Sequence, residues 1–312
     1  MAYSTNMRLY VGVTDGDWFR FLSSRGNVDE VNFWQPSPQN LPRLALGDLF
    51  LFKLKAPHNA IAGGGYFLRA LQMPVSYAWQ AYGENNGAAT QENLRARLVR
   101  LRQGAGIERG DFQIGCLLLT RPFFLAEPQW IPQPKTWASN IVRGQYYELE
   151  SAEGKYLFDA VNRLQTDKML EQFVVSDAPR TEDPRRVWAL LRPGQGYFRS
   201  AVASAYDWRC AVTRERVLPA LEAAHIQPFA EKGPNETRNG LLLRADIHNL
   251  FDQNYVTVTP DMQFRVSSKV REDFENGRDY YSLDKQPLYV PGAESERPAR
   301  EFLDWHNSRF RG

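Results

Sequence analysis

Short apolar runs separated by Pro and Gly fill the first half of the chain, a pattern typical of β-strands joined by turns. The runs cover residues 8–13, 48–54, 61–68 and 114–120. They predict a small curved sheet or a β-barrel. Between residues 90 and 102, leucines instead recur at helical spacing after Thr90, a good N-cap residue. This spacing predicts a helix within the first half.

The second half mixes helical and extended patterns. The helical patterns cover residues 155–173, 197–206 and 299–310, and a strand pair is predicted over 255–266. A polar segment with two prolines, 175–186, predicts an interdomain linker. We therefore expect an α+β fold with two domains, which also suits a chain of 312 residues. The predicted parts are a first domain over 1–150, a helix and linker over 151–192, and a second domain over 193–312.

Composition narrows the function classes. Hydrophobic residues make up 43% and charged residues 24% of the chain, as in ordinary soluble globular proteins. The net charge of +2 is too small to indicate nucleic-acid binding by the whole surface, so any DNA contact must be local. The two cysteines, Cys116 and Cys210, lie too far apart in sequence for a zinc knuckle. No apolar segment approaches the roughly 18 residues of a membrane span, so we expect a cytoplasmic protein without a membrane partner.

The segment over residues 206–252 carries the chemistry, in the predicted order strand, loop, strand, helix. His225 is the candidate general base, because neutral imidazole accepts a proton near neutral pH. Asn239, before Gly240, would hold the loop and the base in place by side-chain hydrogen bonds. His248 and Asp252 stand four residues apart on one helix face and could share a cation.

Each of these residues also has a structural explanation. A histidine beside apolar residues is commonly a hydrogen-bonded core residue, and Asn-Gly is commonly a turn. The clustering of these residue types favours the functional interpretation, since two of the 4 histidines of the chain fall in this one short segment.

Residues from about 194 to 258 resemble HNH (ββα-metal) endonucleases of the bacterial restriction type that lack zinc-knuckle cysteines. The shared motifs are Cys-Ala-Val-Thr at 210–213, Ala-Ala-His-Ile at 223–226, Asn-Gly at 239–240, and His248 with Phe-Asp at 251–252. The resemblance implies that His225 is the general base, Asn239 fixes the loop and His248 binds a metal. One position departs from the family, because Ala224 stands where many members have an acidic or histidine ligand. Asp252, Asp246 or Glu222 would complete the shell, which suits Mg²⁺ or Mn²⁺.

The N-terminal part resembles the PUA-like superfamily, which includes EVE, YTH-like and SRA-type readers of modified bases. The motifs lie at 32–37, 47–52, 61–66 and 114–116. The resemblance implies a β-barrel with a pocket for a modified base flipped out of the duplex. Candidate pocket residues are Asn32, Phe33, Trp34, Tyr66, Trp79 and Trp137, although each ring singly is more commonly a core residue.

Together these parts suggest a modification-dependent, type IV-like restriction endonuclease. Its substrate would be double-stranded foreign DNA carrying 5-methylcytosine or 5-hydroxymethylcytosine, and we expect a homodimer on DNA because two strands must be cut. Two alternatives stay open. The mark could be a phosphorothioate sulfur, since Phe33 and Trp34 lie near two prolines, or the protein could bind modified DNA through an inactive HNH element, as Ala224 suggests.

Overall fold

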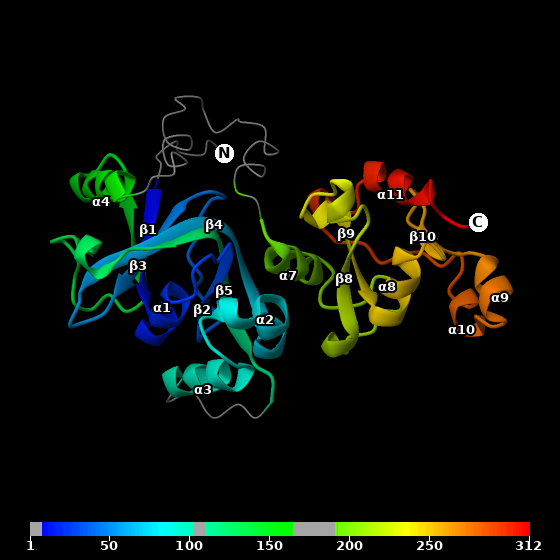
Figure 1. The fold of residues 1–312 in the computed structure, drawn as a ribbon, viewed down its shortest axis with the longest axis horizontal. Helices are drawn as coiled ribbons and strands as arrows, with labels where there is room; N and C mark the ends of the chain where they lie inside the picture. Colours follow the sequence, from blue (N-terminus) through cyan, green and yellow to red (C-terminus); the bar gives the residue numbers. More distant parts are fainter. Residues whose placement is uncertain (1–7, 103–109, 165–190, 192) are drawn as a thin grey trace. The chain divides into compact units, whose positions relative to one another are not determined.

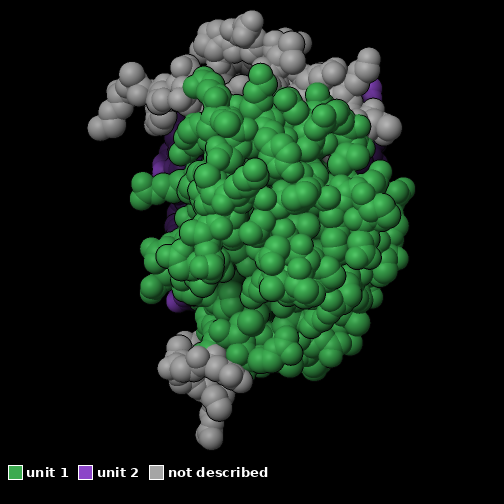
Figure 2. All heavy atoms as spheres, turned by 90° about the vertical axis from the view of Figure 1, so that its left-hand side faces the viewer, with its two compact units in different colours: residues 1–194 green, residues 195–312 purple. Residues whose placement is uncertain are grey.

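The chain forms two compact units, residues 1–194 and 195–312 (Figure 2). The computed structural model describes residues 8–102, 110–164, 191 and 193–312. The predicted linker and the end of the helix predicted over 155–173 lie outside the described residues. The predicted domain boundaries stay predictions.

The first unit contains a seven-stranded sheet. Its main path runs β2-β5-β4-β3-β1-β7, and β6 pairs with β4. The strands are β1 (Arg8–Thr14), β2 (Glu30–Gln35), β3 (Leu49–Leu54), β4 (Ala60–Pro74), β5 (Gln113–Phe124), β6 (Ile131–Pro132) and β7 (Gly144–Glu148). Among the described strands of this sheet, β1 and β3 pair in parallel and the other pairs are antiparallel. The mixed α+β fold is confirmed, but β2 and β7 do not pair within the described residues, so the barrel stays unconfirmed.

Glycines allow the long strand β4 to lie close to its neighbours. A Cβ atom on Gly63 would lie 2.2 Å from the backbone oxygen of Phe123, and one on Gly64 would lie 2.6 Å from that of Phe50. Register shifts in the β4–β5 and β3–β4 pairings occur beside these glycines. In Figure 1, β4 and β5 arch over helix α1.

The α-helices that accompany this sheet among the described residues are α1 (Gly16–Ser23), α2 (Val75–Tyr82), α3 (Gln91–Leu101) and α4 (Ala152–Leu164). The predicted helix over 90–102 is confirmed, and the Thr90 side chain accepts a hydrogen bond from the Asn93 backbone N–H. Its apolar face is narrower than the leucine spacing predicted, because Leu94 and Leu98 are buried but Leu101 is exposed. Short 3₁₀ turns, η1 (Gly83–Asn86) and η2 (Glu127–Gln129), complete the described elements of this unit.

In the second unit, a β-hairpin packs against the helix that precedes it and against the helix that follows it. These elements are β8 (Leu221–His225), β9 (Gly240–Arg244), α8 (Ala245–Asp252) and α7 (Gln195–Ala205). The remaining helices and strands are β10 (Val256–Val258), β11 (Phe264–Val266), α9 (Lys269–Phe274), α10 (Arg278–Tyr281) and α11 (Arg300–Asn307). The 3₁₀ turns are η3 (Leu218–Ala220), η4 (Phe229–Glu231), η5 (Thr237–Asn239) and η6 (Glu294–Glu296). The predicted order strand, loop, strand, helix is thus confirmed.

Both cysteines are free and buried. Within the described part of the chain, no helix has the length and apolar character needed to cross a membrane.

Candidate active site

The β8–β9 hairpin and α8 bring the candidate catalytic residues together. His225 is the last residue of β8 and pairs with Gly240, the first residue of β9. Leu221 and Ala224 of β8 and the leucines 241–243 of β9 are fully buried, which fixes the register of the hairpin. Helix α8 follows β9 at once and packs on β8, so His248 and Asp252 lie close enough to His225 for their charges to act on its pKa.

The imidazole of His225 is held on one face and at one edge. Phe198 of α7 stacks on it with ring centroids 3.6 Å apart and an interplanar angle of 9°. The ring nitrogen Nε2 lies 2.9 Å from Oδ1 of Asn235. Burial lowers the pKa of His225, and the cations His248 and Arg199 lower it further. The hydrogen bond to Asn235 and the charge of Asp252 raise that pKa, but the net direction is downward, which favours the neutral form that a base needs.

Asn239 anchors the loop between the two strands. Its Oδ1 accepts a hydrogen bond from the Gln227 backbone N–H, and its Nδ2 donates to the carbonyls of Gln227 and Pro234. The side chain is fully buried, so these bonds are protected from water. Asn239 therefore makes the loop bonds that the sequence predicted, and its partners are backbone groups of the loop.

His248 lies between two carboxylates. Nδ1 is 2.6 Å from Oε2 of Glu222, and Nε2 is 3.4 Å from Oδ2 of Asp252. Burial lowers the pKa of His248, but the hydrogen bonds and charges of Asp252 and Glu222 raise it more, so the pKa is raised overall. Ala224 is fully buried, and Asp246 is hydrogen-bonded by Arg244. Of the three carboxylates considered, Glu222 and Asp252 are therefore the two that contact His248.

The type and spacing of these donors suit a cation at His248 and Asp252. A carboxylate bound to one ring nitrogen of a histidine is the usual support for a metal on the other nitrogen. Two ligands of one cation at about 2.1 Å lie about 3.0 to 3.4 Å apart, and the separation of Nε2 from Oδ2 falls in this range. Among the described residues, no group of three or more His, Cys, Asp or Glu side chains is arranged to hold a metal ion.

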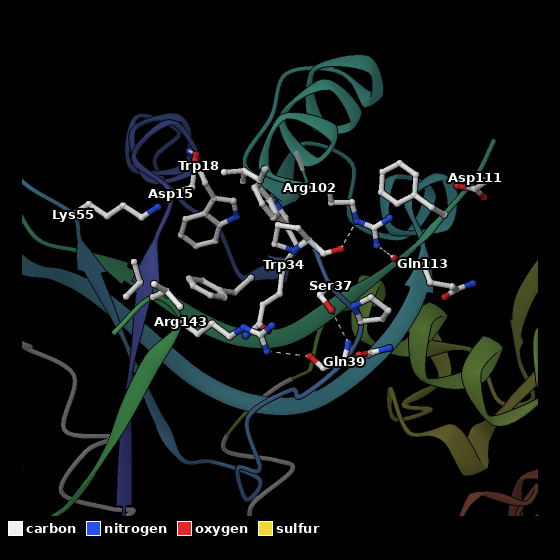
Figure 3. A pocket seen from close by; sticks show the side chains of 18 residues that line it. Asp15, Trp18, Trp34, Ser37, Gln39, Lys55, Arg102, Asp111, Gln113 and Arg143 are labelled. Carbon is white, nitrogen blue, oxygen red and sulfur yellow. Dashed lines mark hydrogen bonds between the residues drawn. The ribbon is translucent and has the colours of Figure 1, made fainter. Parts of the chain in front are cut away.

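The first unit contains a large cavity of about 1010 Å³. Figure 3 shows Trp18, Trp34, Lys55, Arg102 and Arg143 around it. Both indole N–H groups are already used, since Trp18 donates to the Asn32 carbonyl and Trp34 to the Asn86 carbonyl. The cavity thus combines aromatic rings with cationic side chains.

Of the six residues predicted for a base pocket, some line this cavity and the others do not. Phe33 and Trp34 line the cavity, whereas the remaining four are not among its lining residues: Asn32, Tyr66, Trp79 and Trp137. Asn32 is turned into the core, where it donates to Asn86 Oδ1 and Cys116 Sγ. Trp137 is buried with Lys53 over its ring. The motif over residues 32–37 thus contributes Phe33 and Trp34 to this cavity, whereas core contacts occupy Asn32 and Trp137.

Three residues at the two sites had no role in the sequence interpretation. Trp18 lines the cavity from α1, Phe198 stacks on His225, and Asn235 hydrogen-bonds it. Phe198 lies within the segment 194–258 that resembles HNH endonucleases, but no role was predicted for it. For Trp18 and Asn235 no local pattern distinguishes a site residue from a core or loop residue.

Comparison with known proteins finds a family match within the second unit. Residues 210–259 match the family model of the HNH endonuclease. The chain contains an HNH endonuclease domain. The predicted HNH element is therefore confirmed, and HNH enzymes generally use divalent metal ions. No curated protein matches the sequence.

Solved structures include two kinds of neighbour. The ASCH protein from Zymomonas mobilis is 17% identical with a TM-score of 0.33, and the match covers 48% of this chain and 93% of that one. The modification-dependent TagI restriction endonuclease is 13% identical with a TM-score of 0.28, covering 92% of this chain and 78% of that one.

Proposed function

We propose that the protein is a modification-dependent restriction endonuclease that hydrolyses phosphodiester bonds of DNA carrying 5-methylcytosine or 5-hydroxymethylcytosine. One observation carries the nuclease part: the ββα element gathers a base-competent imidazole, His225, with the cation-binding pair His248 and Asp252. The charges of that pair reach His225 and affect its pKa. The HNH match over the same residues supports this part.

The residues divide the work of hydrolysis. His225 takes a proton from water, whose oxygen forms a new bond to phosphorus as the bond to the leaving sugar oxygen breaks. His248 and Asp252 would hold Mg²⁺ or Mn²⁺, and Glu222 would orient His248. The bound cation would supply charge stabilisation at the phosphate and the leaving oxygen.

Recognition of the mark is proposed for the cavity of the first unit. Its rings can stack on an extruded base. Gln35 also lines the cavity, is 8% exposed, and has an amide oxygen without a hydrogen-bond partner among the described residues. A buried acceptor of this kind costs free energy unless a ligand donates to it, and the amino group of cytosine is such a donor.

A cleavage panel tests the proposal. Unmodified, 5-methylcytosine, 5-hydroxymethylcytosine and phosphorothioate duplexes are incubated with wild type in Mg²⁺ and in Mn²⁺. We expect cleavage of cytosine-modified DNA only. Cleavage of phosphorothioate DNA alone would move recognition to the sulfur, which the rings and Pro36 and Pro38 of the cavity could contact. Equal cleavage of all duplexes would remove modification dependence, and cleavage of none, with binding retained, would favour an inactive HNH element.

A matched pair of variants tests the cavity itself. Gln35→Leu keeps the side-chain size but removes the amide oxygen that would accept from the cytosine amino group, and we expect about tenfold weaker binding of cytosine-modified DNA. Gln72→Leu makes the same change at an exposed position of β4 that does not line the cavity and should leave binding of the same DNA unchanged.

A further inference from the structure

The loop between β8 and β9 supplies the direct partner of the candidate base. Oδ1 of Asn235 carries no hydrogen, so the 2.9 Å contact requires that Nε2–H of His225 donates to it. In neutral imidazole only one nitrogen carries a proton. This contact therefore leaves the lone pair on Nδ1.

Stacking alone cannot select this arrangement. Phe198 is buried and fixes the plane of the His225 ring. A Cβ atom at position 240 would lie 3.1 Å from the Phe198 ring and 2.3 Å from Val202, so Gly240 leaves the space that the stack occupies. A half-turn of the imidazole about its Cβ–Cγ bond keeps the same plane but exchanges each nitrogen with a carbon. Only a partner at the ring edge distinguishes the two orientations, and Asn235 is that partner.

Asn239 holds the backbone that carries Asn235. Its Nδ2 donates to the Pro234 carbonyl, 3.0 Å away, in the peptide that leads into Asn235. Its other two bonds hold Gln227 at the opposite side of the loop. The line of contacts runs from Asn239 through the Pro234 peptide and Asn235 to His225.

We propose that Asn235 is the positioning residue that selects the ring orientation and tautomer of His225, so that Nδ1 is the nitrogen that accepts the proton from water. This role rests on the proposed nuclease function. Asn239 acts one step further away, through the backbone that carries Asn235.

The surroundings of the ring determine how substitutions at Asn235 act. The charged groups that reach His225 are Arg199 from α7, and His248 and Asp252 from α8. The Asn235 hydrogen bond raises the pKa of His225 against the effect of burial. Asn235→Asp keeps an acceptor and adds a negative charge, which should raise that pKa. Asn235→Leu removes the acceptor and should lower it.

Rate profiles against pH separate positioning from simple structural support. For Asn235→Leu we expect at least about a tenfold loss of kcat at the optimum, an acid limb moved to lower pH, and unchanged DNA binding. For Asn235→Asp we expect kcat near wild type at high pH and an acid limb moved to higher pH. Asn276→Asp, the same change at an exposed residue of the same unit, should alter neither. Equal rate losses in both Asn235 variants with an unmoved acid limb would overturn the proposal.

A second measurement needs no cleavage. The ¹⁵N shifts of the imidazole rings in the full wild-type chain report the tautomer directly, and His225→Gln assigns the signals among the 4 histidines. We expect a protonated Nε2 and a bare Nδ1 for neutral His225. A protonated Nδ1, or an even mixture, would overturn the proposal even if the enzyme cuts DNA. The expected tautomer in a protein that cuts nothing would instead reject the proposed function and leave the Asn235 contact established.

Discussion

Two histidines of the second unit have nearly the same packing but different chemistry. His225 stacks on Phe198 at 3.6 Å and 9°, and His306 of α11 stacks on Phe251 at 3.7 Å and 9°. Burial is the largest cause that lowers the pKa of each. Packing on a ring and a lowered pKa therefore do not distinguish a catalytic histidine from a structural one.

The hydrogen bonds make the distinction. Nε2–H of His306 donates to the Phe251 carbonyl, and the Thr257 hydroxyl lies 2.8 Å from Nδ1, so both nitrogens are used. His225 has Asn235 at Nε2, and among the described residues we find no partner for Nδ1. A base needs a lone pair that is held in place but not already shared. The comparison predicts that His225 affects rate and His306 affects stability.

The largest effect is expected from His225→Ala. Removal of the proposed general base should lower kcat by about 10³-fold, within the range typical of such groups, while binding to modified DNA is retained. Cleavage rates under single-turnover conditions and a DNA-binding titration check this. His306→Ala, assayed well below its unfolding temperature, is the matched control. Cleavage rates of His225→Ala and His306→Ala that lie within tenfold of each other would contradict the assignment of different roles to the two histidines.

A third histidine separates metal binding from proton transfer. His248→Ala should lower cleavage by about 10²-fold and shift the Mn²⁺ concentration for half-maximal rate upward. His225→Ala should leave that concentration unchanged, because the imidazole of His225 is not a proposed ligand. The measurement is a metal titration of the cleavage rate. An unshifted metal requirement in His248→Ala would remove His248 from the proposed cation site.

The predicted effect on stability concerns His306. His306→Ala leaves the Phe251 carbonyl and the Thr257 hydroxyl without their partner and creates a cavity, which should cost about 2 kcal/mol of unfolding free energy. Denaturant unfolding followed by fluorescence gives this value. The cleavage rate of the folded variant should stay within about twofold of wild type. A stable His306→Ala variant with impaired cleavage would reverse the assigned roles.

The sequence predicted the HNH element because its signal is local. Residue types, spacing and the strand-helix order placed His225, Asn239, His248 and Asp252 on one short segment, and the structure brings them together. Asn235 was missed because an asparagine in a polar loop looks like any turn residue until the fold places it beside a ring.

The cavity was harder to predict for a different reason. Its walls come from segments far apart in sequence, including Trp18, Trp34, Arg102 and Arg143. The motif over 32–37 predicted Phe33 and Trp34 as pocket residues. It also predicted Asn32, whose side chain is hydrogen-bonded to Asn86 in the core. The predicted closed barrel stays unconfirmed, because the sheet path among the described strands is open at β2 and β7, and closure depends on the pairing of distant strands rather than on any one of them.

The smallest effect concerns pH, and it sharpens the distinction between the two histidines. The base form of His225 is neutral, and burial lowers its pKa from the ordinary value of 6.5. A lower pKa extends the neutral form to more acidic solution, so the acid limb of kcat/KM should fall below pH 6.5, with about a tenfold loss per unit beneath it. His306→Ala should leave this limb in place, because its ring faces core partners rather than water. Competition between protons and metal at His248 could produce a similar limb, so the profile is repeated at tenfold higher Mn²⁺. A limb that moves with metal concentration, or one that lies above pH 7, would contradict the assignment to His225.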